Sequence, residues 1–443
     1  MIMNRREFIL GSAGVMLVSP KTLWGADAPS NRLRLCVAGC WEGGRGRQPM
    51  MSAAELPGVE VACVCDVDSR ARDWAANQIL QKTGKAPDRA EDIRRVLERK
   101  DIDGVIIEVP DHWHAPMAWM AMEAGKHVYC EKPCTFSASE GEILVKVQKK
   151  TGKCFQMGNQ RRSSVAYRRC VADIRKGVIG EVKYARTWYR NNRKSIGKGR
   201  ISAPPSWLNW DLWQGPCPRA DYFDNLVHYN WHWFYKYGTG EISNNAVHYL
   251  DVARWALGCE LPTTVSAIGT SGFSPEGDWE WPDTQMITCK FLDEKLITWE
   301  GASRAPGEKP YGWYAGALVY GTKGTILFRP DDRCEQYDLT GKEKVREWNG
   351  DDVLAGDPAK LWKAKLDYWH MENLVEAIRA NDPSLARSPV MDGVVSSHIS
   401  HLANISYRSG ETIHADPKTG ALIGKTGAEF WGREYEKGWE YRG

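Results

Sequence analysis

The sequence lacks the cysteine spacing of a structural zinc site, because none of its 12 cysteines occurs in a CxxC pair. We therefore expect no metal. Its net charge is only +3 over 443 residues, and lysines and arginines are spread along the chain. That balance gives no reason to expect a nucleic-acid partner. Internal repeats and low-complexity linkers are also missing. The length is too great for one hydrophobic core, so two domains are expected.

The N-terminus reads as a targeting segment. An arginine pair, Arg5-Arg6, precedes a short apolar stretch over residues 8–18, and Ala26-Asp27-Ala28 suits a signal peptidase. The stretch is shorter than the roughly 20 residues that span a bilayer. We predict a twin-arginine signal over residues 1–28 and a soluble periplasmic protein. An uncleaved amphipathic helix is the alternative. Because the twin-arginine route exports proteins that have already folded in the reducing cytoplasm, we expect most cysteines to be reduced and buried in the core.

A dinucleotide site is indicated at the start of the mature chain. Leu33 begins a short strand that ends at Gly39, a glycine-rich turn and a helix over residues 47–55 follow, and a second strand ends on Asp66. This is the order of a βαβ dinucleotide-binding unit. Its glycines let the backbone approach the pyrophosphate at the helix N-terminus. Asp66 is suited to accept hydrogen bonds from ribose hydroxyls and to repel a 2′-phosphate, which favours NAD over NADP.

The turn departs from the usual G-x-G-x-x-G spacing, because Trp41 stands where the second glycine is expected. The pattern is recovered if Trp41-Glu42 is an insertion, so that Gly39, Gly43 and Gly46 fill the three roles. After the turn, residues 88–99 look helical. Residues 101–110 and 127–130 look like buried strands with a helix over 111–125 between them, and the second strand ends at Glu131-Lys132-Pro133.

The pattern changes after residue 156. Strand-like runs with few helices between them predict an α+β domain on a largely antiparallel sheet. These runs are residues 182–189, 263–269, 286–292, 297–300 and 315–320.

Four segments carry a family resemblance: "GVIIEVPDHWHAPMAWMAMEAGKHVYCEKP", "MGNQRR", "GVIGEVKYART" and "GTGEISNNAVHYLDVARWALG". They resemble the Gfo/Idh/MocA family, named after glucose-fructose oxidoreductase, inositol dehydrogenase and rhizopine catabolism, from about Leu33 to the C-terminus. The resemblance implies an NAD(P)-dependent oxidoreductase with a Rossmann domain over residues 32–155. It also implies a substrate domain over residues 156–443, whose open sheet covers the nicotinamide end of the cofactor.

The most informative helix is expected to start near Ser243, which can cap it, and to end at Leu257-Gly258. Asn244 and His248 are four residues apart and share a face, with Asp251 one turn further. In the family this pair is usually Asp and His, and with the EKP lysine it surrounds the reacting carbinol. An amide cannot take a proton, so the acid–base work falls on His248 or Lys132.

The expected site follows from these motifs together. We expect cofactor contacts from Gly39, Gly43, Gly46, Asp66, His114, Glu131, Lys132 and Asn159, and chemistry from Lys132, His248 and Asn244.

Two features stay open. His112 and His114 are either part of a metal site or, in one case, a helix cap near the cofactor. The Trp-rich stretch is either plain core or a set of platforms for sugar rings. It comprises Trp207, Trp210, Trp213, Trp231 and Trp233.

An exported dehydrogenase meets no free nicotinamide cofactor, so we expect tightly bound NAD that is returned to its starting state in each cycle. The expected activity is hydride transfer to and from a sugar. The alternatives are glycoside hydrolysis through a keto intermediate, or a non-catalytic sugar-binding protein. We expect a carbohydrate partner, a homo-oligomer and no membrane contact after signal cleavage.

Overall fold

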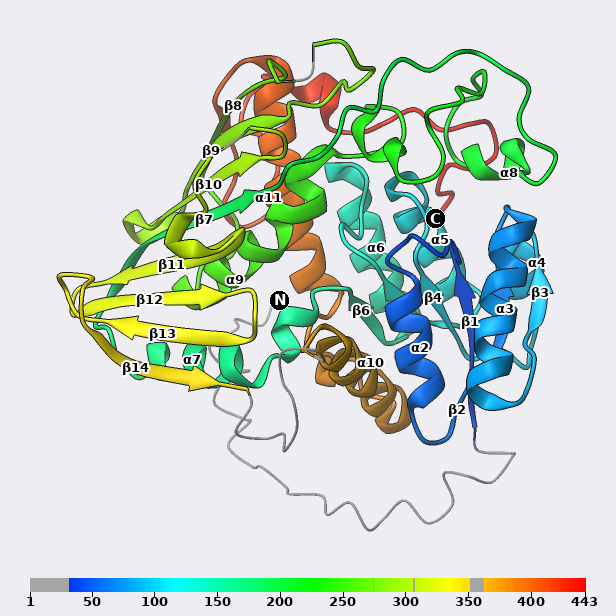
Figure 1. Cartoon of the computed structure of the whole chain (residues 1–443), viewed down its shortest axis with the longest axis horizontal. Coiled ribbons are helices and arrows are strands. Elements are labelled where there is room, and N and C mark those ends of the chain that lie inside the picture. Colours follow the sequence, from blue (N-terminus) through cyan, green and yellow to red (C-terminus); the bar gives the residue numbers. More distant parts are fainter. Residues whose placement is uncertain (1–31, 274, 306, 351–361) are drawn as a thin grey trace.

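The computed structural model of the chain describes residues 32–273, 275–305, 307–350 and 362–443. The predicted signal over residues 1–28 lies outside them. Two sheets organise the described chain, one of six strands and one of nine (Figure 1).

The first sheet is parallel throughout, in the order β3-β2-β1-β4-β5-β6. Its strands are β1 (Leu33–Ala38), β2 (Val59–Cys65), β3 (Asp88–Ala90), β4 (Gly104–Ile107), β5 (His127–Cys130) and β6 (Phe155–Met157). Its helices are α2 (Arg47–Glu55), α3 (Ser69–Thr83), α4 (Ile93–Leu97), α5 (Asp111–Glu123) and α6 (Ala138–Thr151). The strand order reverses between β1 and β4, which is where doubly wound sheets bind dinucleotides. The predicted Rossmann architecture is confirmed.

One predicted helix is wrong. Residues 88–99 form β3, which pairs with the end of β2, and only then the short helix α4. The helix starts late because the Asp92 side chain accepts from the Arg94 backbone N–H and caps α4 there.

The second sheet is mixed but mostly antiparallel, in the order β14-β13-β12-β11-β7-β10-β9-β8-β15, and only β7 and β10 are parallel neighbours. Its strands are β7 (Val182–Arg190), β8 (Thr264–Thr270), β9 (Thr284–Lys290), β10 (Leu296–Ala302), β11 (Ala315–Gly321), β12 (Gly324–Arg329), β13 (Arg333–Tyr337), β14 (Lys344–Asn349) and β15 (Ile413–His414). This confirms the predicted largely antiparallel sheet.

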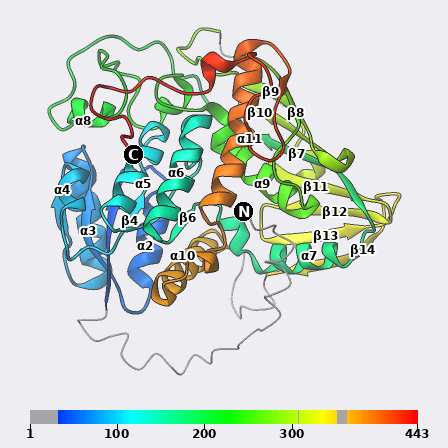
Figure 2. The ribbon, with the colours of Figure 1, turned by 180° about the vertical axis from the view of Figure 1, so that it is seen from behind.

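Helices cover one face of this sheet (Figure 2). The α-helices after β6 are α7 (Val165–Arg175), α8 (Trp210–Gln214), α9 (Val247–Leu257), α10 (Trp362–Ala380) and α11 (Val390–Ser409). A π-helix, η5 (Ile242–Ala246), leads into α9, and the 3-10 helices are η3 (Gln160–Ser163), η4 (Asn230–Trp233), η6 (Leu292–Glu294), η7 (Pro310–Gly312), η10 (Pro383–Leu385) and η11 (Ala428–Phe430). α9 and α11 share one apolar core with the inward residues of β8, β9 and β10.

The two parts of the chain interlock. The predicted boundary after residue 155 falls inside β6. α10, although late in sequence, packs Met371 and Leu374 with Leu35 and Met50 of the first sheet and its helix α2. The C-terminal segment returns to α5 and α6, where Trp439 meets Trp113 edge to face.

All 12 cysteines are buried and free, in agreement with the expected reduced core. Within the described part of the chain, no helix has both the length and the apolar character needed to cross a membrane.

Candidate active site

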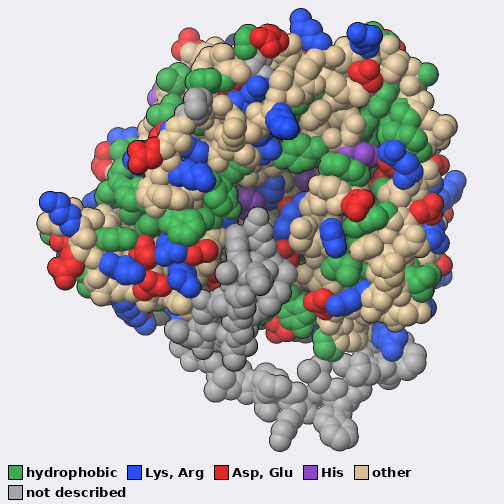
Figure 3. All heavy atoms as spheres, viewed as in Figure 1, with side chains coloured by type: hydrophobic (Ala, Val, Ile, Leu, Met, Phe, Trp, Pro, Cys, Tyr) green, Lys and Arg blue, Asp and Glu red, His purple; other side chains and the backbone are tan. Residues whose placement is uncertain are grey.

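A cavity of about 490 Å³ lies where the carboxyl ends of the first sheet face the second domain. Figure 3 shows histidine and Lys or Arg side chains in the hollow between the two domains. Every predicted site residue except Asn159 lines this cavity; Asn159 is buried outside its wall. The lining residues among the predicted ones are Gly39, Gly43, Gly46, Asp66, His114, Glu131, Lys132, Asn244 and His248.

The glycine turn is tight at two of the three predicted glycines. A Cβ on Gly39, whose φ is +90°, would overlap the Glu108 carbonyl, and a Cβ on Gly46 would lie 2.6 Å from the Gly39 oxygen. These two positions therefore require glycine, the first for the turn and the second for the approach of α2. At Gly43 a Cβ would lie 2.6 Å from the Trp41 indole, so the inserted tryptophan folds back over the turn.

The N-terminus of α2 is open toward a ligand. Its N-cap, Gly46, offers no side-chain acceptor to the first N–H groups of the helix. Unsatisfied N–H groups and the helix dipole attract phosphate oxygens. The turn and this helix end fit a dinucleotide pyrophosphate.

Asp66 lies at the end of β2, where a ribose is expected. Its carboxylate accepts from the backbone N–H groups of Cys40 at 2.6 Å and Asp68 at 2.9 Å, which fix its orientation. Burial raises the pKa of Asp66. Glu91 and Asp92 line the same cavity, so an added 2′-phosphate would meet further negative charge.

Glu108 is a cavity residue that the motif reading missed. Both of its carboxylate oxygens are buried without a partner in the described chain, and burial with repulsion from Glu131 raises its pKa. Its place after β4 was the available signal, because ligands bind at the carboxyl ends of such strands. Hydroxyl groups of a bound ligand would satisfy these oxygens.

Lys132 and Asn244 meet across the domain junction. The Lys132 ammonium donates to the Asn244 backbone carbonyl at 2.8 Å and to its side-chain Oδ1 at 3.1 Å. An ammonium has three donors, so one remains for a ligand. Burial lowers the pKa of Lys132, while the charges of Glu131 and Asp111 oppose that shift.

His248 stands in the first turn of α9 and lines the same cavity. Its Nδ1 is buried and has no hydrogen-bond partner among the described residues. Burial, then repulsion from Lys132, Arg161 and Arg45, holds the pKa of His248 well below its usual range. The imidazole is therefore neutral and free to accept a proton. The three cations come from other segments of the chain, so the spacing of residues around His248 in the sequence does not reveal this shift in its pKa.

The helical segment that carries Asn244 and His248 also begins differently from the prediction. Residues 242–246 form a π-helix, α9 starts at Val247, and the Ser243 hydroxyl is buried without a partner instead of capping. Lys132 occupies the Asn244 carbonyl, a tertiary contact that helical periodicity cannot foresee. Such π turns are frequent at functional sites. The predicted helix end at Leu257-Gly258 is confirmed.

Two family models match the chain. "Oxidoreductase family, NAD-binding Rossmann fold" covers residues 33–159, and "GFO/IDH/MocA C-terminal domain" covers residues 217–327. The chain belongs to the Gfo/Idh/MocA family. It is thus an oxidoreductase-family protein whose first domain binds NAD.

Similar proteins within the Gfo/Idh/MocA family include two curated relatives. A glycosyl hydrolase family 109 protein of Stenotrophomonas maltophilia (strain K279a) is 27% identical over 414 residues, covering 86% of this chain and 88% of the relative. The scyllo-inositol 2-dehydrogenase (NAD(+)) of Bacillus subtilis (strain 168) is 29% identical over 273 residues, covering 61% and 67%. Among solved structures, levoglucosan dehydrogenase in complex with NADH and levoglucosan shares the fold, with a TM-score of 0.64, 18% identity and coverage of 86% and 98%.

The histidine pair and the Trp-rich stretch, which the sequence left open, each have members inside and outside the cavity wall. His112 packs against Trp213 outside the cavity, whereas His114 lines it with Nδ1 2.6 Å from the Pro133 carbonyl oxygen. No group of three or more His, Cys, Asp or Glu side chains is arranged for a metal ion within the described ranges. Trp213 and Trp231 line the cavity, while Trp233 is core and stacks on Trp279. Trp207 and Trp210 lie outside the cavity wall.

The wall opposite Lys132 was largely missed by sequence reasoning. Tyr229 lines it, with φ of +82° and a hydroxyl that accepts from Arg193 at 2.8 Å. Arg193 is in turn paired with the buried Glu241 at 2.9 Å. No periodicity marks residues of this long loop. Further wall residues are Gln160, Arg161, Tyr189, Asn245, Tyr249 and Tyr314.

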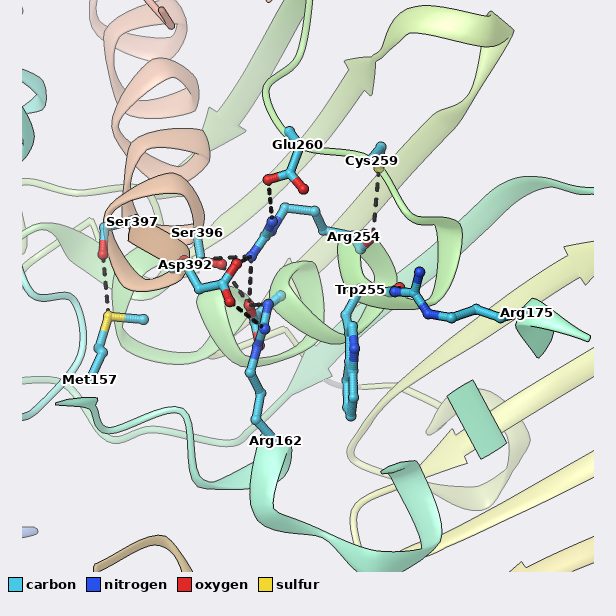
Figure 4. Close-up of polar contacts among 11 residues, drawn as sticks. Met157, Arg162, Arg175, Arg254, Trp255, Cys259, Glu260, Asp392, Ser396 and Ser397 are labelled. Carbon is cyan, nitrogen blue, oxygen red and sulfur yellow. Dashed lines mark hydrogen bonds and ion pairs between the residues drawn. The ribbon is translucent and has the colours of Figure 1, made fainter. Parts of the chain in front are cut away.

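Asp251, expected one turn beyond His248 on the same helix face, belongs to a buried ion network behind the site. Its carboxylate accepts two bonds from Arg162, each of 2.8 Å, and one from Ser396 at 2.6 Å. Figure 4 shows Arg162 and Arg254 converging on Asp392 between α9 and α11. The network ties α9 to the segment after β6 and so fixes the helix that carries His248.

Proposed function

We propose that the protein transfers hydride from a hydroxyl-bearing carbon of a carbohydrate to an NAD that stays bound, and from that cofactor back to a carbonyl carbon of a carbohydrate, so that the cofactor ends each cycle as it began. One observation carries the proposal: Lys132, Asn244 and His248 line the same cavity as the glycine turn and Asp66. The acid–base groups and the cofactor cradle are therefore parts of one site.

The residues divide the work as follows. Bound NAD supplies the hydride acceptor for the carbinol carbon. Lys132 directs its remaining N–H at the substrate oxygen, and Asn244 holds the ammonium in place through two hydrogen bonds. Neutral His248 takes the hydroxyl proton as hydride leaves. The cations that keep His248 neutral also favour an alkoxide-like oxygen.

Carbohydrate is the proposed substrate class for two reasons. Trp213 and Trp231 give the cavity flat aromatic surfaces beside polar groups, which suits stacking on sugar rings. The names of the relatives also point to this class, since they refer to an inositol, to levoglucosan and to glycosides.

Tight retention of NAD is supported by a clasp across the cavity, made of Trp41, His228 and Asp68. Trp41 of the glycine turn stacks on His228 of the second domain, with ring centroids 5.2 Å apart and planes 22° apart. The His228 ring nitrogen Nε2 lies 2.9 Å from the Asp68 carboxylate. Both rings line the cavity, so a bound dinucleotide leaves only when the clasp opens.

NAD is preferred over NADP in this proposal. Asp66, Glu91 and Asp92 together give the ribose end of the cavity a negative wall. We expect Asp66→Ala to lower the NAD content of the purified protein and to weaken its discrimination against NADP. Equal NAD retention in the variant would mean that Asp66 does not bind the ribose.

A second candidate function is net glycoside hydrolysis through a keto intermediate. It is favoured by the similarity to the glycosyl hydrolase family 109 relative, which runs through 86% of this chain. The same neutral His248, or Lys132, would then also remove the proton beside the keto carbon.

Periplasmic location and a homo-oligomeric state complete the proposal. The second is supported by Ile268 and Met286, apolar residues exposed on the outer face of the second sheet.

The deciding experiment uses protein purified by gel filtration without added cofactor. We expect NAD(H) in the supernatant after denaturation, and we expect Trp41→Ala to lose it faster than wild type during dialysis. A panel of free sugars and glycosides, incubated without added NAD, separates the two activities, because only hydrolysis releases the aglycone. A supernatant empty of dinucleotide would contradict the bound-cofactor mechanism. Binding of a sugar with no turnover of any panel member would favour a non-catalytic protein.

A further inference from the structure

Arg161 is a cation of the cavity wall that the proposed chemistry does not use. It stands in η3, and its guanidinium lies over the Tyr249 ring, 4.5 Å from the ring centroid. Tyr249 follows His248 in α9, which places Arg161 on the substrate side of the cavity.

No carboxylate neutralises this guanidinium within the described residues. Arg45, another cation of the cavity wall, pairs with Asp367 and Glu131, whereas no ion pair between described side chains includes Arg161. Its neighbours are phenols: burial raises the pKa values of Tyr249 and Tyr167, so both stay uncharged. A half-buried charge without a counter-ion is costly. In the part of the chain that the structure describes, this charge therefore has no anion to balance it.

The charges around His248 lead to the same conclusion independently. The charged groups of the described chain that shift the pKa of this imidazole are three cations, Lys132, Arg161 and Arg45. The nearby Glu241 is engaged by Arg193, Ser303 and Asn245, so it does not offset them. The pyrophosphate of NAD has its own place at the glycine turn and the start of α2, leaving Arg161 for another ligand.

We propose that the substrate is an acidic carbohydrate, whose oxyanion substituent is bound by Arg161. This inference rests on the proposed function and narrows its substrate class. A carboxylate, as in a uronic acid, matches the planar guanidinium fork in a bidentate contact. A sulfate ester offers the same oxyanion chemistry, and the experiment distinguishes the two.

The test uses full-length protein with its bound NAD and measures sugar binding by calorimetry. The probes are methyl glucuronide and methyl galacturonide, the neutral methyl glucoside and methyl galactoside, and a methyl galactoside sulfate. We expect wild type to bind a uronide roughly 10- to 100-fold more tightly than its neutral counterpart, the range of a hydrogen bond to a charged group. Arg161→Gln should abolish that preference and Arg161→Lys should keep part of it. Arg169→Gln, an exposed arginine of α7, is the matched control and should change nothing.

Each other outcome has a defined meaning. If only the sulfate ester binds more tightly than its neutral counterpart, the substrate still carries an oxyanion for Arg161, but that group is a sulfate ester instead of a carboxylate. If no acidic probe binds more tightly than its neutral counterpart, or if Arg161→Gln keeps the preference, the inference is wrong. Loss of NAD from both Arg161→Gln and Arg161→Lys, with NAD retained in Arg169→Gln, would assign Arg161 to the cofactor and overturn it. Retained NAD with turnover of neutral sugars and no preference for the acidic probes would overturn this inference and leave the proposed function standing.

Discussion

Lys132 and His248 are the two cavity residues to which the proposed mechanism gives the proton transfer. Because a positioned acid or base contributes about 10²- to 10⁴-fold, we expect Lys132→Met and His248→Ala each to slow turnover by about that factor. Bound NAD, measured after denaturation, should remain, since neither side chain forms the glycine cradle. Asn244→Ala is the comparison. Its backbone carbonyl still holds Lys132, so it should weaken substrate binding more than turnover. Near-normal turnover in His248→Ala would show that this helix face is structural.

The pH profile reports on the same pair. His248 acts as a neutral base, so the rate rises with pH through its pKa, which burial and three cations hold well below the usual value of about 6.5. Lys132 acts in its protonated form, so the rate falls through a pKa that burial has lowered. We expect kcat/KM to be flat across neutral pH, with an acid limb well below pH 6.5 that His248→Ala removes. An acid limb near pH 6.5 in wild type would contradict the buried, neutral imidazole.

Among single residues, the sequence predicted those that belong to motifs and missed those that do not. Lys132, Asn244 and His248 follow from strand ends and helix spacing. Tyr229 and Arg193 come from a long loop without periodicity, and the unpaired charge of Arg161 becomes visible only when the surrounding side chains are placed. The pKa of His248 could not be inferred for the same reason.

The glycine turn shows how an element tolerates an insertion. Trp41-Glu42 bulges and folds back, while Gly39 and Gly46 keep the close approaches of the motif. We expect Gly46→Val to lower the NAD content of the purified protein severely, because even its Cβ would lie 2.6 Å from the Gly39 oxygen. Gly272→Ala, in the loop after β8 with its nearest atom at 3.4 Å, is the control and should retain NAD. Full NAD content in Gly46→Val would mean that α2 shifts freely, and the assigned glycine roles would be wrong.

The π turn and α9 depend on the ion network of Figure 4. Arg162→Met leaves the Asp251 carboxylate, 1% exposed, without the two hydrogen bonds of 2.8 Å that it accepts from Arg162. Breaking a buried pair in this way costs about 3–5 kcal/mol, measured as the loss in the free energy of urea unfolding. The double variant Arg162→Met/Asp251→Leu removes both charges and should recover part of that loss. If the double variant recovers none of the lost free energy of unfolding, the stabilising effect of Arg162 comes from its contact with Asp392 instead.

Elements with strong local signals were predictable, and those set by tertiary contacts were not. β1, β2, α5 and β5 follow from apolar runs and stop signals. β3 escaped prediction because it is short, its residues Asp88 and Arg89 are charged and exposed, and it is a strand only through pairing with β2. The π turn likewise lies where the Asn244 carbonyl accepts a hydrogen bond from Lys132, which is more than a hundred residues away in sequence.

On the scale of the whole molecule, the cavity exists because late segments return to the first domain. α10 packs on α2, and the C-terminal segment places Arg433 against the buried Glu140 at 2.7 Å. The clasp of Trp41, His228 and Asp68 adds a third link across the site. The tight retention of NAD proposed above requires the cofactor to enter before the domains close, which favours loading during folding.

That order of events connects the fold to the N-terminal segment, which we propose to be a twin-arginine signal. A protein that folds around NAD in the cytoplasm and is then exported folded needs no cofactor supply outside. We expect replacement of Arg5 and Arg6 by lysine to leave the protein in the cytoplasm, as measured by cell fractionation. Lys21→Arg, which alters the same segment but spares the pair, is the control and should be exported normally. The retained Arg5/Arg6 variant should contain as much NAD(H) as the exported wild type, since loading precedes export. Normal export of that variant would show that the segment is recognised by an export pathway other than the twin-arginine one. Cofactor-free protein in the periplasm, able to bind NAD there, would remove the reason for permanent retention.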